Sequence, residues 1–455
     1  MNGSAVKERS MGGESPKAAP RRSDFRNVSW GLPSAQTGHP ASPANADRAR
    51  AVALVVAHSL QLNQAQNTNG HYDPSLAAGD AGLAVLFGYL DRIFPSAGWD
   101  KIAHQAVLRI SVSLGASAQR SIGLFSGLTG WAFATWSLSR GDTRYKRARL
   151  AIEEALLPKA AVLAASLINR YGIPVEDYDV VTGISGVAAY LLCRINDASA
   201  LRTLRAIVEA LVEVVERATP TPAWFTPADM ISGQAMIGKY PEGYLNCGLA
   251  HGAAGILSLL ALAYREDIEV PKSRSAIERL AHWLIAQGRP DRWGTTWPAA
   301  VGVRDLDPVT PGPMGWCYGN PGVARALWLA GSALDDAGIC ETAKEALRSV
   351  YRRPHSRRGA ISPTFCHGAA GLLQITLRLA NETALPEFFD AANGALERLL
   401  ALFTEDSVFG YRDYDRESGL VDRPGLLEGA AGVALVLLAA ACNQEPEWDR
   451  LFLLS

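Results

Sequence analysis

The chain has 455 residues, 48% of them hydrophobic, and its 44 basic side chains nearly balance 45 acidic ones. This balance argues against a nucleic-acid-binding protein, which usually carries a basic excess. Six cysteines in so long a chain are too sparse for a disulfide framework, and they predict a protein of the reducing cytoplasm. No apolar run approaches the roughly 18 residues that span a bilayer, so we expect no membrane-spanning segment.

The N-terminal segment, residues 1–43, is rich in Gly, Pro, Ser and Ala and has no periodic apolar pattern. Such a segment cannot bury enough apolar surface to offset the entropy lost on ordering it. We therefore expect a disordered N-terminal arm. The remaining residues, 44–455, are expected to form one folded domain.

A short pattern recurs along that domain: a glycine, two residues, a second glycine and then an apolar helical run. Successive copies are 48 to 69 residues apart, which leaves room for two helices in each interval. A repeat of this length indicates one continuous architecture rather than several separate domains. The seven copies are GDAG (79–82), GLTG (127–130), GISG (183–186), GAAG (252–255), GNPG (319–322), GAAG (368–371) and GAAG (429–432).

The helical runs that follow the glycine pairs are apolar on nearly every side, as expected for helices buried all round. The stretches between them, such as residues 272–287, are amphipathic. Together these features predict an all-α fold, an α/α toroid (barrel) of seven inner and seven outer helices. The least regular stretch, residues 218–247, is rich in Pro, Gly and aromatic residues, and we interpret it as a loop insertion on one face.

Reactive side chains occupy matching positions in neighbouring copies. His251, Tyr318 and His367 directly precede the first glycine in copies four, five and six, and Cys317 and Cys366 stand one residue earlier in copies five and six. Matching positions lie at the same end of the inner helices of a toroid, so these side chains should converge. Two thiolates and an imidazole are good zinc ligands and leave a fourth position for water or substrate. The pattern therefore predicts a zinc site at Cys317, Cys366 and His367.

Each of these residues could instead have a purely structural role. A buried cysteine beside a helix, for example, usually acts as a small hydrophobe. His251 has an alanine where the later copies have cysteine, so we predict that it transfers protons rather than binding metal. Asp179 lies four residues before the glycine pair of copy three, where it either points toward the same opening or caps a helix. Three cysteines in or beside apolar runs are assigned to the core: Cys193, Cys340 and Cys442.

Four motifs in combination resemble the lanthionine synthetase C-like family, the cyclases of lantibiotic biosynthesis. The resemblance extends over residues 45–455. It implies an α/α toroid with one zinc ion per chain, held by Cys317, Cys366 and His367. The motifs are YDVVTGISG (178–186), GLAHGAAG (248–255), WCYGNPG (316–322) and CHGAAG (366–371).

The same resemblance implies that His251 is the catalytic acid or base and that Asp179 is a second catalytic residue. One position departs from the family pattern. Pro313 stands where the bacterial cyclases often have an arginine. The role of that arginine is then either absent or supplied by Arg304 or Arg325.

The activity that the resemblance implies is zinc-dependent addition of peptide Cys thiols to dehydroalanine or dehydrobutyrine, which forms (methyl)lanthionine rings. The substrate would be a dehydrated precursor peptide. A LanB-like dehydratase and an ABC exporter would be partners, in the cytoplasm or peripherally at the membrane. Alternatives are a related enzyme that adds glutathione to dehydroamino acids, a non-catalytic scaffold of a biosynthetic complex, and a toroidal glycosidase. The glycosidase needs paired carboxylates at the opening, where only Glu428 directly precedes a glycine pair.

Overall fold

The computed structural model describes residues 43–66, 72–114, 121–232, 234–304, 312, 314–354, 362–415 and 417–455. Pro43 begins the first helix, and the rest of the expected N-terminal arm lies outside the described residues, as does Pro313. None of the described helices is long and apolar enough to cross a membrane.

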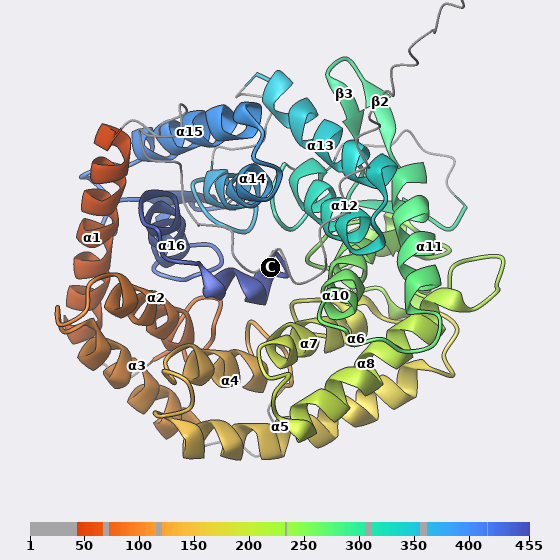
Figure 1. Cartoon of the computed structure of the whole chain (residues 1–455), viewed down its shortest axis with the longest axis horizontal. Coiled ribbons are helices and arrows are strands. Elements are labelled where there is room, and N and C mark those ends of the chain that lie inside the picture. Colours follow the sequence, from red (N-terminus) through yellow and green to blue (C-terminus); the bar gives the residue numbers. More distant parts are fainter. Residues whose placement is uncertain are drawn as a thin grey trace, which may run out of the picture.

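The main helices of the described chain form two concentric rings (Figure 1). This is the predicted α/α toroid, with seven inner and seven outer helices among the described residues. The inner ring consists of α2 (Asp80–Ile93), α4 (Leu128–Ser137), α7 (Ile184–Leu192), α10 (Ala253–Arg265), α12 (Asn320–Leu334), α14 (Ala369–Thr383) and α16 (Ala430–Ala441). The outer ring consists of α1 (Pro43–Gln66), α3 (Trp99–Leu114), α5 (Lys146–Leu167), α8 (Ala198–Glu216), α11 (Ser273–Ala286), α13 (Ala337–Arg352) and α15 (Pro386–Ala401).

The chain alternates between the rings, starting with an outer helix and ending with an inner one. The first outer helix, α1, packs against the last inner helix, α16, so the two ends of the repeat close the ring. Nearly every residue of α16 is buried, as the apolar runs after the glycine pairs predict. The outer helices bury only one face; α8 and α13 are amphipathic examples.

Each glycine pair begins an inner helix. The first glycine is the N-cap residue in all seven copies, from Gly79 before α2 to Gly429 before α16. The second glycine lies in the first turn, where an added Cβ would come 2.0–2.4 Å from the carbonyl oxygen six residues earlier. Only glycine therefore allows the preceding loop to fold back so closely over the start of the helix.

Backbone hydrogen bonds join the loops before the inner helices into a closed circuit. The amide of Cys317 donates to the carbonyl of Cys366 (3.0 Å), that of Cys366 to Leu427 (3.0 Å), and that of Leu427 to Ala77 (2.9 Å). The amide of Ala250 donates in turn to Cys317 (3.3 Å). Matching positions of all copies are thus held in register at one end of the toroid. The circuit is completed by bonds from Ala77 to Phe125, from Phe125 to Val181 and from Val180 to Ala250.

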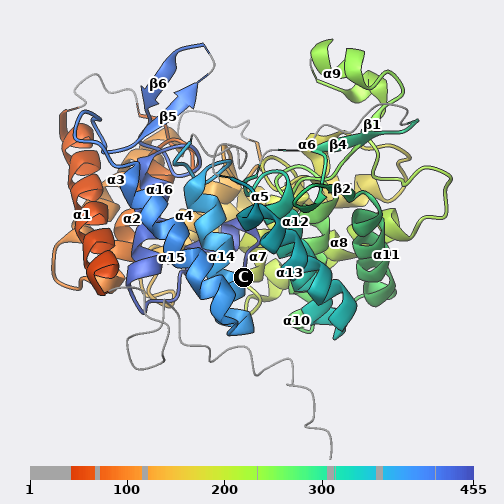
Figure 2. The same ribbon diagram turned by 90° about the horizontal axis from the view of Figure 1, so that it is seen from above.

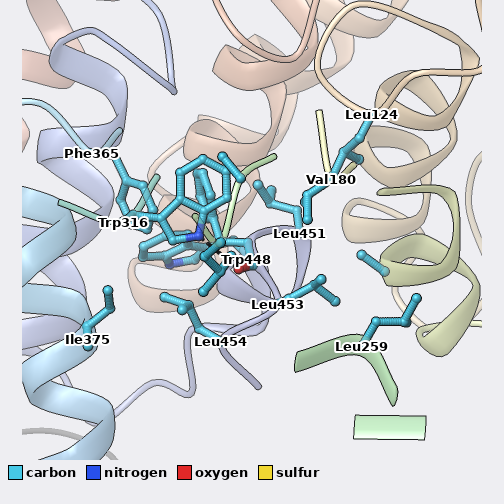
Figure 3. Close-up of a cluster of buried hydrophobic side chains, with 14 of the residues drawn as sticks. Leu124, Val180, Leu259, Trp316, Phe365, Ile375, Trp448, Leu451, Leu453 and Leu454 are labelled. Atoms are coloured by element: carbon cyan, nitrogen blue, oxygen red, sulfur yellow. Dashed lines mark hydrogen bonds between the residues drawn. The ribbon is translucent and has the colours of Figure 1, made fainter. Parts of the chain in front are cut away.

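The C-terminal residues fill the centre of the toroid (Figure 1). The 3-10 helix η5 (Glu447–Phe452) places Phe452 against Phe365, with ring centroids 3.7 Å apart, and against Trp316 at 4.9 Å. The indole N–H of Trp316 donates to the carbonyl oxygen of Phe452 (2.9 Å). Figure 3 shows Trp316 and Phe365 together with Trp448 and the buried leucines of the C-terminus. Because Trp316 and Phe365 directly precede Cys317 and Cys366, the C-terminal plug supports the two loops that carry these cysteines.

Three two-stranded antiparallel pairs accompany the helices in the described chain. Figure 2 shows the β5–β6 hairpin and the short helix α9 (Gln234–Lys239) projecting at one end of the toroid. Residues 218–247 contain α9, the 3-10 helix η3 (Ala228–Met230) and strand β1. The strands are β1 (Tyr244–Asn246) with β4 (Ala300–Gly302), β2 (Arg289–Asp291) with β3 (Gly294–Thr296), and β5 (Arg412–Asp415) with β6 (Gly419–Asp422).

Candidate metal centre

The structure brings the side chains of Cys317, Cys366 and His367 together where the loops before α12 and α14 meet. One candidate ligand atom from each residue lies within 4.8 Å of the other two. Zinc ligands lie about 2.0–2.3 Å from the ion in a tetrahedral arrangement, so two ligands of one ion are about 3.3–3.8 Å apart. The three donors therefore need to approach one another by no more than about 1.5 Å to hold a single ion. Within the described ranges, no other three His, Cys, Asp or Glu side chains are grouped in this way.

Close packing of two loops accounts for this convergence. The amide of Cys317 bonds to the carbonyl of Cys366, and a Cβ on Gly315 would lie only 2.6 Å from the Cα of His367. A hydrogen bond with Cys317, and then burial, raises the pKa of the Cys366 thiol well above its ordinary value. Two adjacent thiolates thus destabilise each other unless a cation offsets their charge. This donor set fits a divalent metal such as zinc.

Two carboxylates flank the imidazole of His367. Oδ1 of Asp413 lies 3.9 Å from Nε2, and Oε1 of Glu428 lies 4.0 Å from Nδ1. Nothing in the sequence indicated Asp413, because it belongs to the β5–β6 hairpin and has no counterpart in the other copies of the repeat. Glu428 occupies the position of His367 in the seventh copy.

The loops before α7 and α10 place Asp179 beside His251. Oδ2 of Asp179 lies 2.6 Å from Nδ1 of His251, and the aspartate is buried whereas the histidine is one-third exposed. Oδ1 of Asp179 accepts hydrogen bonds from the amides of Thr182 (2.7 Å) and Gly183 (2.8 Å). These bonds hold the carboxylate rigidly against the imidazole, so they fix which nitrogen of His251 is directed to Asp179.

Tyr318 lies between the Asp179–His251 pair and the metal centre. It follows Cys317 directly, and its ring centroid lies 5.9 Å from that of His251. The amide group of Asn246 donates to its hydroxyl oxygen (3.2 Å). Burial raises the pKa of Tyr318, so the hydroxyl remains protonated at neutral pH. The sequence comparison of the repeats identified Tyr318 as a matching position, but nothing in the sequence indicated the role of Asn246.

Arg304 and Arg325 were the two candidates to replace the arginine that the family often has where this chain has Pro313. Both guanidinium groups are paired with a glutamate. Arg325 is fully buried, pairs with Glu382 (2.7 Å) and donates to the carbonyl of Leu454 in the C-terminal plug. The suggestion that Arg325 supplies a charge to the site is therefore wrong, because its hydrogen bonds are used to anchor the C-terminus. Arg304 is exposed and paired with Glu242 (2.8 Å).

The sequence model of the lanthionine synthetase C-like proteins matches residues 70–453. The chain belongs to the lanthionine synthetase C-like family. The match includes every copy of the glycine repeat, the three grouped metal-binding side chains and the Asp179–His251 pair. It confirms the family that the four sequence motifs predict.

Two known proteins are similar to this chain. The nisin biosynthesis protein NisC of Lactococcus lactis subsp. lactis is 27% identical over 334 residues, which cover 69% of this chain and 72% of NisC. A solved structure of nisin cyclase superposes with a TM-score of 0.74 at 24% identity, covering 88% of this chain and 96% of the cyclase. The two structures therefore share the toroidal fold.

Proposed function

We propose that the protein is a zinc-dependent lanthipeptide cyclase. It would add Cys thiols of a dehydrated precursor peptide to dehydroalanine or dehydrobutyrine and so form (methyl)lanthionine rings. The observation that carries this proposal is the grouping of Cys317, Cys366 and His367 on loops that adjoin the Asp179–His251 pair. Membership of the lanthionine synthetase C-like family and the similarity to NisC support it.

Cys317, Cys366 and His367 would hold one zinc ion per chain and leave a fourth position for the thiol of the substrate. Zinc held by these residues would favour the thiolate form of a bound substrate thiol at neutral pH, where a free cysteine with a pKa of about 8.5 is mostly protonated. The backbone bond between the two cysteine loops keeps the ligands in place before the substrate arrives. Little ordering entropy is then lost when the site is filled.

His251 would be the proton donor. When the substrate sulfur bonds to the β-carbon, the electrons of the double bond move toward the neighbouring carbonyl, and the α-carbon must take up a proton. Asp179 holds Nδ1 of His251, which leaves Nε2 to deliver this proton. The thiol proton lost at the start balances the proton gained at the α-carbon, so ring formation leaves the mass of the peptide unchanged.

The chemistry of the site also supports a proposal for the compartment in which the protein works. Its two thiol ligands require a reducing compartment, so we place the reaction in the cytoplasm, either free or peripherally at the membrane. Dehydrated Ser and Thr must be produced before the thiol can add. A LanB-like dehydratase would supply the peptide, and an ABC exporter would remove the product.

The test uses a dehydrated peptide with one cysteine and one dehydroalanine, incubated with the zinc-loaded protein. Free thiols are counted by alkylation and mass spectrometry, because cyclisation itself does not change the mass. We expect the alkylated peptide to disappear with the wild-type protein and to persist with Cys317→Ala. A peptide that stays alkylatable while zinc remains bound would contradict the proposal in favour of a scaffold, and preferential formation of a glutathione adduct would favour the glutathione-adding alternative.

A further inference from the structure

Asp413 is a buried carboxylate with an unsatisfied oxygen. It lies in β5, its side chain is 3% exposed, and its Oδ1 has no hydrogen-bond partner within the described structure. The other oxygen, Oδ2, lies 3.6 Å from Nη1 of Arg423. A buried acceptor without a donor destabilises the folded state, and more so when it is charged. Such an atom therefore calls for a functional explanation.

The unsatisfied oxygen faces Nε2 of His367 at 3.9 Å. We propose that Asp413 is a positioning residue of the metal centre: it accepts a hydrogen bond from Nε2–H of His367 and thereby leaves Nδ1 as the metal ligand. This inference rests on the proposed zinc site. The two atoms must approach by about 1 Å to reach a normal hydrogen-bond length of about 2.9 Å. Metal-bound histidines usually donate their second N–H to a carboxylate or carbonyl, which fixes the ring and makes it a stronger ligand.

Glu428 is the competing partner, since its Oε1 lies 4.0 Å from Nδ1 of the same ring. Its environment differs from that of Asp413 in two ways. Its side chain is 41% exposed, and its Oε2 already accepts a hydrogen bond from Arg423 (2.7 Å). Arg423 therefore already bonds Glu428, which is also open to solvent, whereas Oδ1 of Asp413 is buried, has no hydrogen-bond partner in the described structure and lies 3.9 Å from the imidazole. The geometry favours Asp413 as the partner and Nδ1 as the ligand.

Asp415 provides a matched control on the same hairpin. It is two residues from Asp413 in β5 and pairs with the same arginine, Arg423, at 2.9 Å, but its side chain is 31% exposed. Replacing Asp415 removes the same charge and also disturbs Arg423. It leaves the contact between Asp413 and His367 in place.

The experiment measures zinc affinity of the full-length protein by competition with a chromogenic chelator. Asp413→Ala should bind zinc roughly 10–100-fold more weakly than the wild type, the usual effect of losing the partner of a metal-bound histidine. Asp413→Asn, which keeps an acceptor oxygen, should lose less. Asp415→Asn and Glu428→Gln should bind as the wild type does. Thermal unfolding in excess chelator should show that every variant is folded without metal, which separates metal affinity from folding.

A spectroscopic measurement tests the ligand atom itself. NMR of ¹⁵N-histidine-labelled, zinc-loaded protein should show His367 bound to the metal through Nδ1 and protonated at Nε2. Equal zinc affinities of Asp413→Ala and wild type, a larger loss in Glu428→Gln, or coordination through Nε2 would each overturn the inference while leaving the zinc site intact. A wild-type protein that binds no zinc would instead overturn the proposed function.

Discussion

One carboxylate oxygen of Asp179 lies 2.6 Å from Nδ1 of His251, while the other accepts two backbone hydrogen bonds at the start of α7. The sequence left open whether Asp179 points toward the opening or caps a helix. One oxygen contacts His251, and the other holds the turn that leads into α7 without capping the helix itself. Because the backbone amides hold the carboxylate in place, the orientation of His251 is set by the fold. The imidazole is therefore already oriented for proton transfer before substrate binds.

His251→Ala should keep its zinc and still bind a dehydrated peptide, because none of the grouped metal-binding side chains is altered. Cyclisation should fall by roughly 10²–10⁴-fold, the usual range for the loss of a general acid or base. Zinc content and rate are to be measured on the same preparation. Loss of zinc would make His251 a ligand or a support of the metal centre, and full activity would mean that the proton comes from elsewhere.

Asp179→Asn should also slow cyclisation without removing zinc. Its Oδ1 can still accept the amides of Thr182 and Gly183, but its NH₂ group then faces Nδ1 of His251 and favours the opposite tautomer of the ring. The rate should fall by roughly tenfold or more, up to the value for His251→Ala. When two residues act as a unit, the rate losses caused by replacing each of them do not add. The double variant should therefore be no slower than His251→Ala alone. Additive losses would show that the two residues act independently.

Phe452→Ala should destabilise the toroid by roughly 3–5 kcal/mol, because this buried ring packs against Phe365 and Trp316 at the centre of the molecule. Urea unfolding of the metal-free protein measures the change. Val162→Ala is the control, since this side chain on α5 is 71% exposed and its loss should change stability by no more than about 0.5 kcal/mol. Equal effects of the two substitutions would show that the C-terminal plug contributes nothing to stability.

Removal of residues 1–42 should leave folding and zinc content intact. These residues have no periodic apolar pattern, and the first helix begins at Pro43. Circular dichroism and metal analysis of the truncated protein provide the comparison with the full chain. An insoluble or metal-free product would mean that the arm packs on the toroid.

The repeat and the grouped side chains could be predicted from the sequence because both depend on local requirements that recur. A glycine is needed wherever a loop crosses the first turn of an inner helix, so the pairs mark all seven helices and align Cys317 with Cys366. The C-terminal plug has no such signal, because its buried leucines show no helical or strand period. The position of Asp413 depends on how one hairpin packs against one loop, and the burial of Arg325 depends on its contacts with Glu382 and Leu454. Contacts of this kind are set by the tertiary structure alone.

The most direct test of a zinc-dependent cyclase is a titration of the metal-free protein with zinc, in which the rate of ring closure is followed by the loss of alkylatable peptide thiol. We expect the rate to rise with added zinc and to reach its maximum at one equivalent per chain. Cys317→Ala should stay inactive throughout, whereas Cys340→Ala on the outer helix α13 should follow the wild-type curve. Ring closure at full rate without metal, or a fully zinc-loaded wild-type protein that closes no ring, would contradict this account.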